Sequence, residues 1–216
     1  MPSRHVVQQG ECLSSIAKQH GFRRWRTVYD DPANAALRQK RPDPNILAPG
    51  DVVMIPDKQP RVEEAATGAR HTFFVAVAPT MLRVALVDMK PRRYRLTVEG
   101  EVFEGPVPDS GLIERPIQPD ARSGQLAVWL TDDTSGDGIT WDLDIGALDP
   151  VDHLTGVKAR LNNLGYDAGA VNETPNDDSK GAVSTFQTRH GETATGDADP
   201  AFREELRQAH DVKGAA

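Results

Sequence analysis

The hydrophobic periodicity of the chain changes twice, and these changes most constrain its fold. Residues 1–56 contain a short apolar strand, a helical segment and a second apolar strand that ends at Pro56. Residues 72–149 alternate apolar and polar side chains, whereas from residue 150 apolar residues recur at helical spacing. Hydrophobic residues make up 38% of the 216-residue chain, which favours several small cores over one large core. The sequence therefore predicts a multidomain α+β protein.

The alternating region predicts an antiparallel β-sandwich over residues 72–149. Short apolar runs follow one another about every ten residues and are separated by Gly, Pro, Asp or Ser turns, which is typical of such sandwiches. The runs are Arg83–Met89, Tyr94–Glu99, Val102–Glu104, Leu112–Glu114, Gln125–Leu130 and Ile139–Ile145. The segment 94–113 is similar to prealbumin-like or immunoglobulin-like repeats, which implies a spacer. Residues 57–71 lack periodicity and are predicted to be a linker.

The last region predicts a three-helix bundle over residues 150–210, followed by a disordered tail at 211–216. Apolar residues fall on one face of each of the first two helices, and Asp199 or Pro200 is expected to open the third. The apolar positions are Val157, Leu161 and Leu164, then Ala182, Val183 and Phe186, then Phe202 and Leu206.

The segments 5–21 and 45–56 together resemble a LysM module, a βααβ fold that grips the N-acetylglucosamine backbone of peptidoglycan and chitin. The resemblance places the sugar site in the loops after the first strand and before the second. The implied glycan-binding residues are Gly10, Glu11, Cys12, Leu13, Asn45, Ile46, Leu47 and Ala48. Family members usually carry Asp-Thr where this chain has Glu11-Cys12. For Gly10 and Leu47, turn geometry and core filling are alternatives to ligand contact, and for Ile16 a core position is favoured.

The middle of this module, residues 23–41, carries one aromatic and several basic candidates. Trp25 either stacks on a sugar ring or begins a helix, and the helix start is favoured. The basic side chains either meet carboxylates of a ligand or partner, or form a solvated face, which is the commoner outcome. They are Arg23, Arg24, Arg26, Arg38, Lys40 and Arg41.

Three short motifs in residues 150–210 together resemble the three-helix peptidoglycan-binding domain. They are Leu164-Gly165-Tyr166, the run from Ala182 to Gln187, and Thr195-Gly196-Asp197. The family normally has Asp-Gly-x-Phe-Gly after its first helix, but this chain has Asn172–Asp178 there and lacks those glycines. We therefore expect weak wall binding by this domain, or a fold used for docking.

Catalysis, cofactors and several partner classes receive no support. The net charge of −7 and the lack of a basic stripe argue against nucleic acid and anionic membranes. No apolar run approaches the ~20 residues of a membrane span, and the single Cys12 excludes an intrachain disulfide. The six histidines show no zinc-peptidase spacing, and no phosphate-binding loop is present. We expect no enzyme activity, no metal and no cofactor.

These expectations combine into a non-catalytic protein that binds peptidoglycan through N-acetylglucosamine units. Two wall-type modules on an acidic chain without a signal peptide resemble accessory proteins of contractile injection systems, such as type VI secretion. Such a protein would be cytoplasmic when made and delivered to the envelope or exterior by the machine; alternatively, the sequence given lacks an export leader. Two other functions stay open: a structural adaptor that binds a spike or effector protein without glycan affinity, and a fragment of a wall hydrolase.

Overall fold

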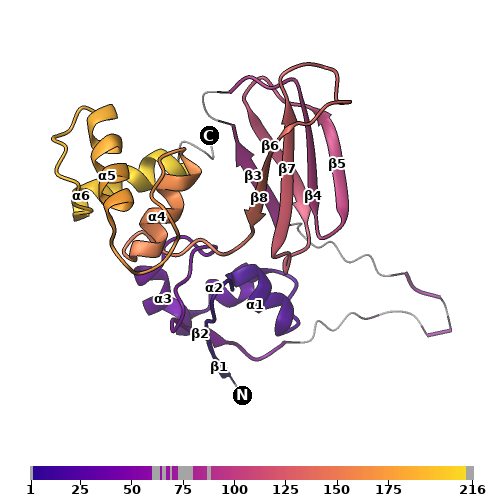
Figure 1. Ribbon diagram of the computed structural model, residues 1–216. Helices are drawn as coiled ribbons and strands as arrows, with labels where there is room; N and C mark the ends of the chain where they lie inside the picture. The colour runs from indigo at the N-terminus through magenta and orange to yellow at the C-terminus, as the bar shows by residue number, and fades with distance from the viewer. Residues whose placement is uncertain are drawn as a thin grey trace. The chain divides into compact units, whose positions relative to one another are not determined.

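The computed structural model describes residues 2–59, 64, 67–68, 70–72, 80–86 and 89–212. It is a mixed α+β protein with antiparallel strands and a C-terminal helical region (Figure 1). The chain divides into two compact units, Met1–Thr80 with Gln118–Asp120, and Met81–Ile117 with Ala121–Ala216. None of the described helices has the length and apolar character needed to cross a bilayer.

In the first unit, two short strands enclose a series of helical turns. Strand β1 (Ser3–Val6) pairs antiparallel with β2 (Val52–Ile55), with Ser3 opposite Ile55 and Val6 opposite Val52. The segments between them are α1 (Leu13–Gln19), α2 (Trp25–Tyr29), the 3-10 turn η1 (Pro32–Asn34) and α3 (Ala35–Lys40).

The expected βααβ order is therefore incomplete, because a third α-helix and a 3-10 turn lie before β2. Asp31 causes the extra turn, since its side chain accepts a hydrogen bond from the Ala33 N–H at 2.9 Å. Pro32 follows at the first position, where its fixed φ favours a helical turn. Asn34 is buried and ties this turn to β2, because its amide bonds both the N–H and the C=O of Met54.

The core of the first unit is formed by α1, α2, α3, β2 and residues of the loops beside the two strands. Val28, Tyr29 and Leu37, from α2 and α3, are all buried. The core consists of Val7, Leu13, Ile16, Ala17, Val28, Tyr29, Leu37, Leu47, Val53 and Ile55. Because Ile16 is fully buried, its expected core position is confirmed.

The second unit begins with six described strands in two sheets that share one core. Strand β3 (Thr80–Ala85) pairs with β6 (Leu112–Ile117). The other sheet has the order β5 (Glu101–Pro106), β4 (Arg93–Val98), β7 (Ser123–Trp129) and β8 (Ile139–Asp144). The buried core residues are Tyr94, Leu96, Val98, Ile113, Ile117, Ala121, Leu126 and Val128.

The predicted strand positions agree with these elements except at the first strand. The run Arg83–Met89 was expected to be extended, but the strand occupies Thr80–Ala85, and Val87 and Asp88 lie outside the described residues. Residues 73–79, at the start of the predicted sandwich, also lie outside them. The predicted linker 57–71 has no helix or strand among its described positions, which exclude 60–63, 65–66 and 69.

The rest of the second unit is helical and has its own core. It contains α4 (Leu154–Asn163), α5 (Asp177–Arg189), α6 (Pro200–Arg207) and a π-helical turn, η2 (Gln208–Val212). Asp199 caps α6 by accepting from the Phe202 N–H at 2.9 Å, so the expected start of the third helix is confirmed. The core consists of Val157, Leu161, Tyr166, Ala168, Ala182, Val183, Phe186, Phe202 and Leu206.

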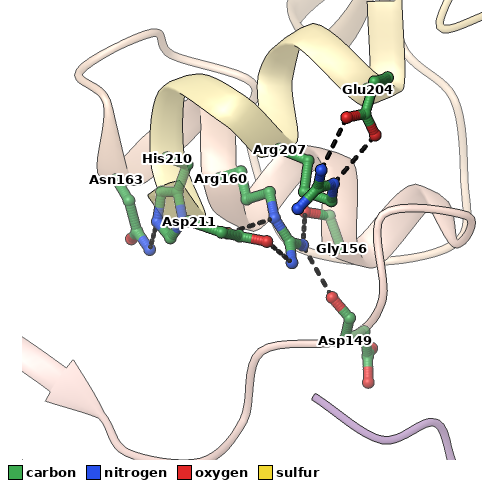
Figure 2. Close-up of polar contacts among 8 residues, drawn as sticks. All are labelled: Asp149, Gly156, Arg160, Asn163, Glu204, Arg207, His210 and Asp211. Atoms are coloured by element: carbon green, nitrogen blue, oxygen red, sulfur yellow. Dashed lines mark hydrogen bonds and ion pairs between the residues drawn. The ribbon is translucent and has the colours of Figure 1, made fainter. Parts of the chain in front are cut away.

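A buried arginine joins the two ends of this helical region (Figure 2). Arg160 is 1% exposed and donates two hydrogen bonds to the Asp211 carboxylate, each 3.0 Å long. It also donates to the backbone oxygens of Asp149 at 2.8 Å and Gly156 at 2.9 Å. The expected disordered tail at 211–216 is therefore wrong at its first residue, because Asp211 is part of η2 and of this ion pair. Residues 213–216 lie outside the described part of the chain.

Candidate functional site

The two loops predicted to hold a glycan are joined in the first unit by a backbone hydrogen bond. The Leu13 N–H donates to the Pro44 carbonyl at 3.2 Å, so the loop after β1 lies against the loop before β2. The side chains of Leu13, Leu47 and Ala48 are buried and do not face solvent. The predicted residues that keep exposed surface are Gly10, Glu11, Cys12, Asn45 and Ile46.

Glu11 holds the first of these loops in place. Its carboxylate accepts from the Gln8 N–H at 2.9 Å and contacts the His5 ring nitrogen Nε2 at 2.8 Å. The other nitrogen of His5 lies 3.2 Å from Nε2 of His20. Burial, and then the neighbouring His5, lower the pKa of His20 below its ordinary value. The Glu11 carboxylate therefore organises the loop from within, while Gly10 at φ 79° provides its left-handed turn.

Asp51 holds the second loop, and sequence reasoning missed it. Its side chain is 2% exposed and accepts from Arg41 Nε at 2.7 Å, Lys40 Nζ at 2.7 Å and the Ala48 N–H at 2.9 Å. Burial opposes ionisation, but the hydrogen bonds from Lys40, Arg41 and Ala48 outweigh it and lower the pKa of Asp51. In the sequence, the indication of this role was that Asp51 is an acidic residue between two apolar runs in a basic segment.

These contacts correct the expected role of half of the basic cluster. Lys40 and Arg41 bind Asp51, and Arg38 donates to the backbone oxygens of Tyr29 and Asp31. Arg38, Lys40 and Arg41 are thus used within the fold, although Lys40 stays exposed, whereas Arg23, Arg24 and Arg26 form an exposed group.

Trp25 is placed at the start of α2, partly buried against the core. Its ring meets Tyr29 edge-on at 5.8 Å, and the guanidinium of Arg26 lies 4.8 Å from its centroid. This position agrees with the favoured role at a helix start, and Arg26 covers part of the ring that would have stacked on a sugar.

In the helical region, a buried lysine organises the loop that lacks the family's glycines. Lys158 is 1% exposed, and its ammonium donates to Thr174 O at 2.7 Å, Asn172 Oδ1 at 3.0 Å and Ala170 O at 3.3 Å. The loop before α5 is thus ordered by oxygen atoms gathered around one cation. The periodicity gave no sign of this, because a lysine in a helix is normally exposed.

Two of the sequence motifs meet at Gln187. Its side-chain oxygen accepts from the N–H groups of Thr195 and Gly196, both at 3.0 Å, and its amide nitrogen donates to Thr195 Oγ1 at 3.0 Å. Gly196 has φ 74°, a conformation that favours glycine. The glutamine that ends one motif therefore fixes the Thr-Gly-Asp turn that forms the other.

An open pocket of about 430 Å³ lies along α5 in this helical region. One wall comes from the turn after α4, with Tyr166 and Asp167, and the other from α5, with Asp177, Gly181 and Arg189. The Arg189 guanidinium lies 5.2 Å from the centroid of the Tyr166 ring. The pocket was not predicted, since it depends on the packing of the turn beside the helix.

Metal chemistry has no assembled site in the described part of the chain, where no three His, Cys, Asp or Glu side chains are arranged as metal ligands. The acidic and basic groups of the two candidate regions are arranged to form hydrogen bonds and ion pairs.

Comparison with known proteins identifies one part of the chain. Residues 154–206 match a family described as a putative peptidoglycan binding domain. This match covers α4, α5 and α6 and agrees with the predicted resemblance of the helical region. No curated protein and no solved structure matches the chain. The helical region is therefore similar to peptidoglycan-binding domains.

Proposed function

We propose that this protein binds peptidoglycan without catalysing a reaction on it. The observation that carries the proposal is the match of residues 154–206 to a putative peptidoglycan binding domain. The helical region supports it with an open pocket that carries both acidic and basic side chains. Binding through hydrogen bonds and ion pairs requires no nucleophile or metal.

We further propose that the first unit is a LysM-like module that holds N-acetylglucosamine units at its two joined loops. Support comes from the bond between Leu13 and Pro44 and from the internal hydrogen bonds of Glu11 and Asp51. Loops fixed in this way lose little conformational freedom when a ligand binds. Backbone groups near Gly10 and Asn45 would bond the acetamide, and Ile46 would cover its methyl group.

A role as an accessory of a contractile injection machine is the third part of the proposal. It rests on the proposed LysM-like module and the region that matches a putative peptidoglycan binding domain, which occur together in one acidic chain. The protein would then act in the cell envelope or outside the cell. The alternative is an adaptor that binds a spike or effector protein and no glycan.

Sedimentation of the full chain with purified insoluble peptidoglycan, and separately with chitin, tests the proposal. We expect the protein to sediment with both. Peptidoglycan offers both glycan and peptide, whereas chitin offers only N-acetylglucosamine, the ligand proposed for the first unit. Ile46→Asp should weaken sedimentation with chitin, while Val6→Asp, at a 49% exposed position on β1, should leave it unchanged. Protein that stays in the supernatant with peptidoglycan would refute the proposal and favour the adaptor. Sedimentation with peptidoglycan but not chitin would refute only the LysM-like part.

A further inference from the structure

The pocket along α5 carries opposite charges at its two ends. Asp177 lies in the first turn of α5, Asp167 lies in the facing turn, and Arg189 ends the helix. Within the described part of the chain, neither the Asp177 carboxylate nor the Arg189 guanidinium forms a hydrogen bond or ion pair with another side chain. Both charges are therefore available to a ligand in the pocket.

The floor of the pocket is a glycine that the fold does not require. Gly181 lies within α5, and a Cβ atom added there would meet nothing within 4 Å. Glycine inside a helix is less stable than alanine, so helix formation favours alanine at this position and packing does not oppose it. The absent side chain instead keeps the pocket open between its charged ends.

The pocket residues of α5 follow one stripe of the helix. Asp177, Gly181, Thr185 and Arg189 are spaced by four residues, so they lie on one face. The twelve steps from Asp177 to Arg189 span roughly 18 Å of helix axis. An extended peptide rises about 3.3 Å per residue, so roughly five residues would cover this stripe. Charges that complement the helix dipole need no ligand, but dipole complementation does not explain Gly181.

We propose that this pocket binds the stem peptide of peptidoglycan in an extended conformation. The free ammonium of the peptide's basic residue would lie at Asp177 and Asp167, and its terminal carboxylate would lie at Arg189. Thr185 donates its hydroxyl to the Gly181 carbonyl at 2.8 Å, which leaves the oxygen free to accept from a peptide N–H. The inference rests on the proposed function and names the component of peptidoglycan that the helical region recognises.

Titration of the full chain with the synthetic pentapeptide L-Ala-γ-D-Glu-L-Lys-D-Ala-D-Ala tests the inference by calorimetry and amide NMR. We expect saturable binding, with shifts in residues 165–167 and 177–189. Gly181→Ala should reduce affinity at least tenfold while raising the melting temperature of the helical region, because alanine favours the helix. Gly136→Ala is the matched control, since its added Cβ also meets nothing within 4 Å and it lies outside the pocket.

Modified peptides test the orientation. Acetylation of the lysine should weaken binding to the unmodified protein more than it weakens binding to Asp177→Asn, which retains only Asp167. A C-terminal amide should behave likewise with Arg189→Gln. No binding of the pentapeptide, or equal binding by Gly181→Ala, would overturn the inference. If the protein still sediments with peptidoglycan in that case, the proposed function stands and only the stem-peptide site is lost.

Discussion

Replacement of Asp51 by asparagine is expected to destabilise the first unit selectively. The change keeps the shape of the side chain and removes the charge that faces Arg41 and Lys40 at 2.7 Å. The side chains of Asp51 and Arg41 are 2% and 6% exposed, so Arg41 would lose its carboxylate in a buried site. Removing one member of a buried pair costs about 3–5 kcal/mol, and the remaining amide oxygen recovers about 1 kcal/mol. We therefore expect a loss of about 3 kcal/mol.

Urea unfolding of the full chain, followed by the amide signals of each unit, measures this loss. Separate signals are needed because a chain with two compact units need not unfold in one step. Signals from β1, α1 and β2 should disappear at lower urea than in the unmodified protein, while those of the second unit should keep their midpoint. Asp30→Asn, an exposed control at the end of α2, should change stability by less than about 0.5 kcal/mol.

The pH dependence of the Asp51 effect has a defined sign. Because the pKa of Asp51 is lowered in the folded state, its contribution to stability is present above the ordinary value near 3.8 and is lost as pH falls through the folded pKa. The difference between the two proteins should therefore shrink in acid. A loss below about 1 kcal/mol at neutral pH would refute the assignment of Asp51 as the residue that holds this loop.

Three further predictions concern the helical region. Lys158→Met should lower the free energy of opening the loop before α5 by about 1–2 kcal/mol, because the hydrogen bonds from the ammonium to the loop oxygens are lost. Unchanged hydrogen exchange of the Thr174 amide would contradict this. Gln187→Leu should lower the free energy of unfolding by about 2 kcal/mol, because two N–H groups of the Thr-Gly-Asp turn lose their acceptor. In thermal melting, the melting temperature of Gln187→Glu should lie closer to that of the unmodified protein. Burial raises the pKa of Asp211, but hydrogen bonds from His210 and Arg160 overcome it and lower the pKa, so this stabilisation is present above about pH 4 and lost in more acid solution. Arg160→Met should reduce that pH dependence in acid unfolding curves, and an unchanged dependence would contradict this.

Periodicity predicted the elements because it reflects which side chains each core buries. Leu161 and Phe186 each lie on the predicted apolar face of their helix and are buried as expected. The start of α6 followed from local chemistry, since Asp199 bonds a backbone group three residues away. Signals of this kind act over a few residues and can be found in the sequence alone.

The buried charges were missed because their partners are distant in sequence. Lys158 and Arg160 lie between the core residues Val157 and Leu161 and look like solvated helix residues, yet both are 1% exposed. Arg160 meets Asp211 across 51 residues, and Lys158 meets oxygens 12 to 16 residues ahead. Such pairs form only after the chain has folded, so neither composition nor periodicity reveals them.

The candidate sites were predictable to different extents. The resemblance identified both loops of the first unit, but Leu13, Leu47 and Ala48 are buried rather than presented at the surface. Their burial follows from the packing of the loops against the core, which sequence spacing does not specify. The pocket on α5 depends in the same way on how the turn at Asp167 lies beside the helix.

Amide NMR of the full chain during titration with soluble peptidoglycan fragments, which carry both sugar and stem peptide, tests the central claim most directly. We predict saturable shifts in the loops at residues 8–13 and 44–48 and along the pocket at 165–167 and 177–189. Spectra that remain unchanged at millimolar fragment concentration would contradict the claim that this protein recognises the bacterial wall.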